Sequence, residues 1–171
     1  MSNGIIRKID DLGRIVVPKE LRKKLKIGVG DYLDIENKED KIILSKYTLL
    51  NNIDTSFNKI IKIIEDLTND TVIITDRYKV IITNDSKKDK YLEQPISGYL
   101  KKIMDIDKPI VEYVLNDIEI IEGLRENASY VIKNIKLDGD IVGLFIMLNN
   151  DKKIEDSSLI ISTLVSSFIS N

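Results

Sequence analysis

The chain has 171 residues, 43% of them hydrophobic, and contains neither cysteine nor histidine. The lack of these two residue types excludes thiol nucleophiles, Ser-His-Asp triads, histidine general bases and the usual zinc sites. The net charge of −2 is unevenly spread, because residues 1–27 carry eight cations against three acids while residues 48–171 carry fifteen against twenty. A basic end on an acidic body favours nucleic acid or another polyanion as the partner of that end.

The first residues predict two short strands joined by a turn. Residues 5–9 and 14–17 are rich in Ile and Val, which is typical of strands. Between them, Asp10-Asp11-Leu12-Gly13 predicts a turn in which Gly13 takes a positive φ. Arg7 and Arg14 flank this turn, so we expect both to project from one end of the hairpin.

A short helix and a second hairpin follow. Pro18 suits the first turn of a helix, where its missing N–H would be unpaired anyway. Leu21 and Leu25 lie four residues apart and are expected to share its buried side. Residues 32–36 and 41–46 predict strands around the polar sequence Asn37-Lys38-Glu39-Asp40. So small a unit buries little surface alone, and a two-fold dimer would both stabilise it and double its cationic face.

The ordered pattern from Gly4 to Arg22, Gly-Ile-x-Arg-Lys-Ile-Asp-Asp-Leu-Gly-Arg-Ile-Val-Val-Pro-Lys-Glu-Leu-Arg, resembles the AbrB-type swapped-hairpin DNA-binding domain of bacterial transition-state regulators. The resemblance covers residues 1–50. It implies that two chains interleave their hairpins into one β-barrel, an intertwined dimer that binds double-stranded DNA. By motif match, it places the DNA contacts on the basic residues Arg7, Lys8, Arg14, Arg22 and Lys23. Arg is more frequent in the family at the position of Lys23, which puts a bidentate contact there in question.

The rest of the chain predicts helices and antiparallel strands. After a connector at residues 51–56, Phe57, Ile60, Ile61, Ile64 and Leu67 follow the i, i+3, i+4, i+7 spacing of an amphipathic helix. Such a helix, placed directly after the connector, is suited to pack against its copy in a partner chain. The last predicted helix covers residues 154–169, with an apolar stripe formed by Ile161, Leu164, Val165 and Phe168.

Between these helices the sequence predicts strands and a mostly helical stretch. The strands are expected at residues 71–75, 79–83, 111–115, 130–137 and 141–148, and the helical stretch at residues 86–105. This order is typical of an α+β domain with an antiparallel sheet and flanking helices. The whole chain is thus predicted to be an α+β two-domain protein.

Residues 57–171 resemble the GAF-like second half of a sporulation regulator from spore-forming bacteria. The resemblance implies a transcription factor of sporulation genes that dimerises through its first domain and forms a tetramer through its second. A GAF-like domain can also hold a small molecule, although no residue here identifies a ligand. Assembly and ligand sensing therefore both remain open for residues 57–171.

The predicted function is sequence-specific binding of double-stranded DNA, without enzymatic activity, cofactor or metal. The alternative is an antitoxin with the same barrel, whose C-terminal segment would neutralise a toxin. Such segments tend to be short and unstructured, whereas residues 57–171 have the pattern of a folded domain. An enzyme would need a catalytic group other than His or Cys. No apolar run is long enough for a membrane span, so a cytoplasmic protein is expected.

Overall fold

The computed structural model describes residues 4–25, 27–47, 56–106 and 108–170. The chain divides into two compact units, Met1–Tyr47 and Thr48–Asn171. Of the connector expected at residues 51–56, all but Ser56 lies outside the described residues. In the part of the chain that is described, no helix has the length and apolar character needed to cross a membrane.

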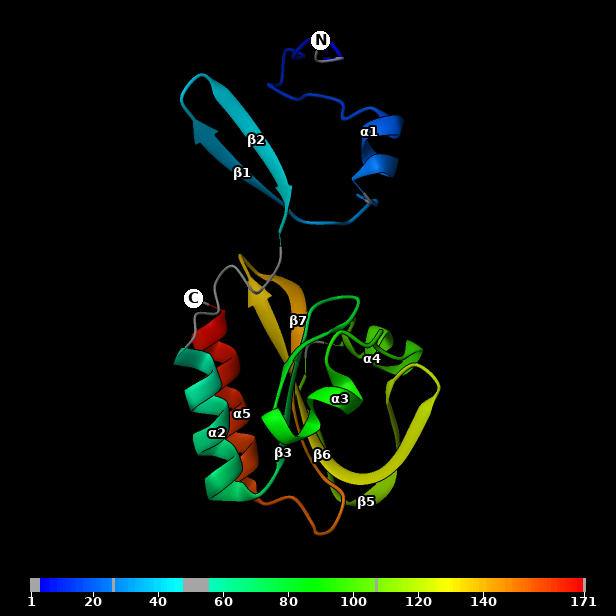
Figure 1. Cartoon of the computed structure of the whole chain (residues 1–171), viewed down its shortest axis with the longest axis vertical. Coiled ribbons are helices and arrows are strands. Elements are labelled where there is room, and N and C mark those ends of the chain that lie inside the picture. The colour runs from blue at the N-terminus through cyan, green and yellow to red at the C-terminus, as the bar shows by residue number, and fades with distance from the viewer. Residues whose placement is uncertain (1–3, 26, 48–55, 107, 171) are drawn as a thin grey trace. The chain divides into compact units, whose positions relative to one another are not determined.

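The N-terminal unit contains one short helix and one hairpin (Figure 1). Helix α1 spans Lys19–Lys24 directly after Pro18, as predicted. Strands β1 (Leu33–Lys38) and β2 (Lys41–Lys46) pair antiparallel, with Lys38 opposite Lys41. The predicted second hairpin is confirmed, but its turn is only two residues long because β1 extends to Lys38, further than the polar tip suggested.

The two strands expected before α1 do not form in the single chain. Residues 4–9 and 14–18 have no ladder partner and are not strands, so this prediction is wrong for one isolated copy. The turn between them is present: the Gly13 N–H donates to the Asp10 carbonyl at 2.9 Å, and Gly13 has the predicted positive φ of 78°. The local turn chemistry is sufficient for the bend, whereas a strand also requires a neighbouring strand.

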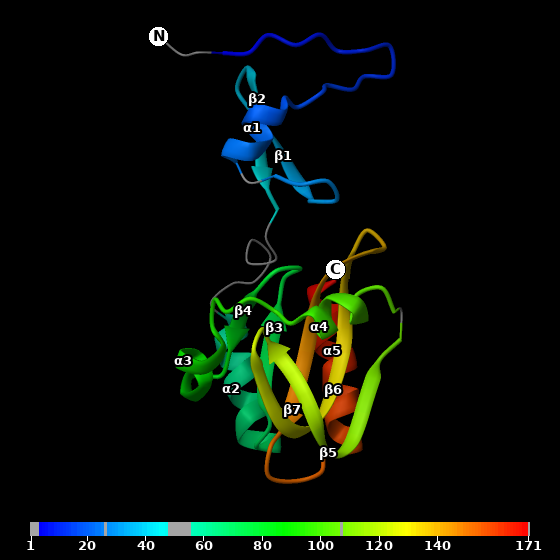
Figure 2. The ribbon, with the colours of Figure 1, turned by 90° about the vertical axis from the view of Figure 1, so that its right-hand side faces the viewer.

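The second unit is built on a five-stranded antiparallel sheet in the order β4-β3-β7-β6-β5. Figures 1 and 2 show α2 and α5 on one face of this sheet and α3 and α4 on the other. The predicted GAF-like arrangement, an antiparallel sheet with flanking helices, is therefore confirmed. The strands are β3 (Thr71–Thr75), β4 (Val80–Thr83), β5 (Ile110–Ile121), β6 (Leu124–Leu137) and β7 (Asp140–Asn149).

The helices lie close to their predicted positions, and the mostly helical stretch at residues 86–105 consists of short helices. They are α2 (Ser56–Thr68), the short 3-10 helix η2 (Asp85–Lys87), α3 (Lys88–Tyr91), α4 (Gly98–Ile103) and α5 (Asp156–Ile169). Apolar side chains alternate between the two faces of the central strand β7. Leu144, Ile146 and Leu148 belong to the core on the α4 side, and Phe145 and Met147, which alternate with them, are also fully buried.

Candidate nucleic-acid interface and self-association face

Asp10 organises the turn that precedes α1. Its carboxylate oxygen Oδ1 accepts hydrogen bonds from the backbone N–H of Leu12 at 3.0 Å and from that of Arg14 at 2.8 Å. Its other oxygen, Oδ2, accepts from Nε of the Arg14 side chain at 2.8 Å. An Asp side chain that binds backbone N–H groups two residues further on is a common device for closing turns. Here the same carboxylate also holds a guanidinium group.

The five basic residues expected to contact DNA lie on two parts of the N-terminal unit. Arg7 and Lys8 come before the turn and Arg14 follows it, and all three are exposed. Arg22 is half-buried and Lys23 exposed, both in the last turn of α1, where cations also complement the negative end of the helix dipole. The sequence did not single out Asp10 as a functional residue. The signal available was an Asp at the start of a turn with an Arg four residues later.

The N-terminal unit leaves its apolar side chains uncovered. Among its described residues none is buried. Leu21 and Leu25, which were expected to form the buried side of α1, are 37% and 52% exposed, so that expectation is wrong for a single copy. The other large apolar side chains that remain exposed are Ile5, Ile6, Ile9, Leu12, Ile15, Val16, Val29, Ile35, Ile42, Ile43 and Leu44. Apolar exposure on this scale is typical of a surface that binds a partner protein or another ligand.

Helix α5 leaves part of its predicted apolar stripe exposed. The residues that it buries against the sheet are mostly serines, Ser158, Ser162 and Ser166, spaced four apart. The hydroxyls of Ser162 and Ser166 donate to carbonyls of their own helix, at 2.9 Å and 3.1 Å, so their burial leaves those donors satisfied. The apolar row Ile160, Leu164 and Phe168 points away from the sheet and is 61–68% exposed.

Helix α2 adds to the same uncovered surface. Phe57, Ile61 and Ile64 of the predicted apolar side are buried within the single chain, whereas Leu67 of that side is 75% exposed and Ile63 is also exposed. The two helices lie side by side, and the rings of Phe57 and Phe168 have their centroids 6.0 Å apart. We call the exposed apolar residues of the pair the α2–α5 face, which consists of Ile63, Leu67, Ile160, Leu164 and Phe168.

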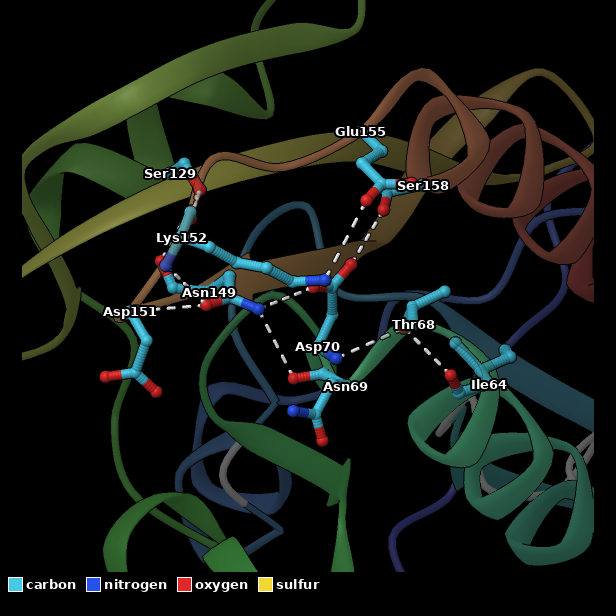
Figure 3. A network of polar contacts seen from close by, with 10 residues as sticks. All are labelled: Ile64, Thr68, Asn69, Asp70, Ser129, Asn149, Asp151, Lys152, Glu155 and Ser158. Carbon is cyan, nitrogen blue, oxygen red and sulfur yellow. Dashed lines mark hydrogen bonds and ion pairs between the residues drawn. The ribbon is translucent and has the colours of Figure 1, made fainter.

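A polar cluster ties the end of α2 to the start of α5 (Figure 3). Asp70 is only 3% exposed, and its carboxylate accepts from Ser158 Oγ at 2.7 Å and from Asn149 Nδ2 at 2.8 Å. Asn149 in turn accepts from the N–H groups of Asp151 and Lys152, both at 3.0 Å. The cluster joins α2, the end of β7 and the first turn of α5, so it determines how the two helices present their shared face.

The opposite face of the sheet is closed by the protein's own side chains. Tyr91 of α3 is 1% exposed, and Leu100 of α4 is fully buried. The Tyr91 hydroxyl contacts both carboxylate oxygens of Glu126, at 2.7 Å and 2.8 Å, and Lys90 Nζ donates to the same carboxylate at 2.7 Å. Burial, reinforced by the bond to Glu126, raises the pKa of Tyr91 well above its ordinary value. Tyr91 therefore stays neutral and holds α3 against β6.

Comparison with known proteins identifies both parts of the chain. Residues 54–171 match the family model "Stage V sporulation protein T C-terminal, transcription factor", and residues 6–49 match "Antidote-toxin recognition MazE, bacterial antitoxin". The chain is similar to stage V sporulation protein T of Bacillus subtilis, with 32% identity over 153 residues that cover 88% of this chain and 86% of that protein.

Two further similarities concern one unit each. Transition state regulatory protein AbrB of Bacillus subtilis is 54% identical over 46 residues, which are 27% of this chain and 48% of AbrB. The type II free methionine-R-sulfoxide reductase of Thermoplasma acidophilum aligns with a TM-score of 0.54 and 12% identity, over 72% of this chain and 93% of that chain. At that identity the reductase shares the fold alone. Because one family model covers more than half of its residues and a relative matches most of its length, the chain belongs to the stage V sporulation protein T family of transcription factors.

Proposed function

We propose that the chain regulates sporulation genes in the cytoplasm by binding double-stranded DNA through a dimer of its N-terminal unit. The observation that carries this proposal is the uncovered apolar surface of that unit, which has no buried residue among those described in one copy. A second copy interleaved with the first would cover Leu21 and Leu25 and supply the missing strand partners for residues 5–9 and 14–17. The dimer then presents two sets of cations on one body.

The proposed DNA contacts are Arg7, Lys8, Arg14, Arg22 and Lys23 of each copy. Arg14 directly follows the turn and carries a planar guanidinium, which suits bidentate recognition of guanine in the major groove. Arg22 and Lys23 at the end of α1 suit contacts with phosphates, which position a protein on the duplex. The acidic second unit is unsuited to phosphate binding, so the division into a DNA-binding domain at residues 1–50 and an assembly domain at residues 57–171 follows from charge.

The second unit is proposed to join two such dimers into a tetramer through the α2–α5 face. A helix that buries serines and exposes Ile160, Leu164 and Phe168 is explained if a second copy packs on it. Sensing of a small molecule remains the second candidate for this unit. The exposed apolar row of α5 favours assembly over ligand sensing.

An antitoxin role is the alternative for the N-terminal unit, because residues 6–49 match the MazE model. Toxin neutralisation by a C-terminal segment would require a chain end that can wrap around a partner. The second unit of this chain instead forms a folded domain, in which α5 packs against β6 and β7. A regulator with a folded second domain therefore accounts for more of the chain.

The proposal is tested by replacing Arg14. We expect Arg14→Ala in the full-length protein to weaken binding to a duplex selected from random sequence by about 1–3 kcal/mol, the range for one bidentate base contact. Lys41→Ala is the matched control, since Lys41 is an exposed cation of the same unit at the tip of the β1–β2 hairpin. Fluorescence anisotropy at fixed salt measures both. Equal affinities of Arg14→Ala and the unsubstituted protein would contradict the proposed role of Arg14.

A further inference from the structure

Asp10 is an acidic residue in the middle of a surface that is otherwise cationic. Arg7 and Lys8 precede it and Arg14 follows, so a carboxylate here would be repelled by any polyanion bound to the same surface. Its neighbour Asp11 has the same charge. The two differ in their contacts, because Asp11 makes no hydrogen bond or ion pair with the described residues, whereas Asp10 makes three through its carboxylate. Asp10 would therefore repel a bound polyanion, but unlike Asp11 it also binds the turn and the Arg14 side chain.

We propose that Asp10 is a specificity-determining positioning residue, which holds the Arg14 guanidinium in one orientation so that Arg14 discriminates between bases. This inference rests on the proposed function, in which Arg14 faces the DNA. The first support is geometric. A guanidinium is planar and rigid, so a bond from Nε to Asp10 Oδ2 at 2.8 Å, together with the attachment of the side chain at Cδ, defines its plane.

The second support is the part of Arg14 that remains available. Among the described residues the intramolecular bond of the guanidinium is made by Nε, and the two Nη groups lie on the part of the fork that reaches further from the backbone. The Arg14 side chain is 71% exposed. Bidentate recognition of the O6 and N7 atoms of guanine needs two such donors in a fixed arrangement. Holding the group before DNA arrives removes part of the ordering cost of the contact.

The third support is electrostatic. The backbone N–H of Arg14, followed by its side chain, lowers the pKa of Asp10 below its ordinary value, which further stabilises the ionised carboxylate. A fixed negative charge on the protein repels DNA phosphates. Attraction to phosphates contributes most of the non-specific affinity of DNA-binding proteins, so the carboxylate lowers that affinity. Asp10 thus weakens binding to arbitrary sequence while it prepares Arg14 for the correct one. Both effects raise the ratio of specific to non-specific affinity.

The test compares Asp10→Asn with Asp11→Asn in the full-length protein. The two substitutions each remove one negative charge, at adjacent positions, but only Asp10→Asn removes the ion pair with Arg14. Asn at position 10 retains an oxygen that can accept from the N–H groups of Leu12 and Arg14, so the turn is preserved. The probes are a duplex selected from random sequence by the unsubstituted protein and a scrambled duplex of equal length, measured by anisotropy at one salt concentration.

For Asp11→Asn we expect similar gains in affinity for both duplexes. The ratio of the affinity for the selected duplex to that for the scrambled duplex should therefore stay within about twofold of its value for the unsubstituted protein. For Asp10→Asn we expect the ratio to fall by about tenfold, because binding to the selected duplex loses its oriented guanidinium. In an Arg14→Ala background, Asp10→Asn should behave like Asp11→Asn. Equal ratios for Asp10→Asn and Asp11→Asn in the presence of Arg14 would overturn the inference.

A second substitution keeps the inference testable if Asp10→Asn disturbs folding. Arg14→Lys retains the charge but has no Nε–H and no planar fork. We therefore expect the ratio of affinities for the selected and scrambled duplexes to fall about as far as it does for Asp10→Asn. A ratio within twofold of the original for Arg14→Lys would equally overturn the inference. Failure of the proposed function looks different: the unsubstituted protein would bind neither duplex, or Arg14→Ala would leave its binding unchanged.

Discussion

Ser158, Ser162 and Ser166 occupy the side of α5 that faces the sheet, where a larger side chain would hold the helix further away. Their hydroxyls are satisfied by the carbonyls of the helix or by Asp70, so they can be buried at little cost. Asp70 then fixes the first turn of α5 relative to the end of β7. At this scale, polar residues inside the second unit determine which residues of α5 are left to face outward.

Asp70→Ala tests the role of this buried carboxylate. The substitution removes the acceptor of Ser158 Oγ and one of two acceptors of Asn149 Nδ2, which also donates to the Asn69 carbonyl at 3.3 Å. We expect the free energy of unfolding to fall by about 2–4 kcal/mol. Asp151→Ala is the control, because Asp151 is exposed and joins the cluster only through its backbone N–H. Urea denaturation at one protein concentration measures both. Equal midpoints for the two variants would show that the carboxylate contributes nothing to stability.

At the scale of elements, α2 and α5 differ in how far their sequences reveal their orientation. In α2 the helical spacing of Phe57, Ile61 and Ile64 correctly indicates the buried side. In α5 the apolar stripe of Leu164 and Phe168 has the same spacing but faces outward. Periodicity shows that a helix has an apolar side, and it does not distinguish the core of one chain from a contact between two.

Leu164→Asp tests whether the α2–α5 face is a contact between copies. Leu164 is 65% exposed in one chain, so the new charge does not enter the core of that chain. We expect the variant to sediment as a dimer where the unsubstituted protein sediments as a tetramer. Thr163→Asp, on the neighbouring exposed position, adds the same charge outside the apolar row. If both variants keep the mass of the unsubstituted protein, the proposed face is wrong.

The remaining differences between sequence and structure have similar physical causes. The hairpin of β1 and β2 and the strands β3 and β4 are local pairings, and their apolar alternation and turn residues were sufficient to predict them. Strand β5 extends to Ile121, well past the predicted end at residue 115. The prediction ended there because Asn116 and Asp117 are unfavourable in strands, but β5 lies at the edge of the sheet, where such residues are better tolerated.

For the proposed DNA-binding site too, the sequence predicted local features but not contacts that depend on the fold. The cationic residues Arg7, Lys8, Arg14, Arg22 and Lys23 were accessible from the sequence because charge and motif are local properties. The strands expected at residues 5–9 and 14–17 do not form in the structure, because no other segment of the described chain pairs with them. The contact of Asp10 with Arg14 depends on the bend of the turn, so it became visible only in three dimensions.

At the scale of the whole molecule, the proposed assembly assigns DNA binding to the basic unit and self-association to the acidic unit. Two N-terminal dimers joined through the α2–α5 face would act on one long duplex with a high effective concentration, and would gain affinity without a new contact to DNA. The account depends above all on the first step, in which a dimer brings the cations of two copies to the same duplex.

The salt dependence of DNA binding tests that step most directly. For six to ten neutralised phosphates, the logarithm of the affinity of the full-length protein should fall against the logarithm of salt concentration with a slope of about −5 to −9. Lys23→Ala should reduce the magnitude of the slope by about 2, because each dimer loses two phosphate contacts, and Lys41→Ala should leave it unchanged. A slope near zero, or equal slopes for Lys23→Ala and the unsubstituted protein, would contradict the account.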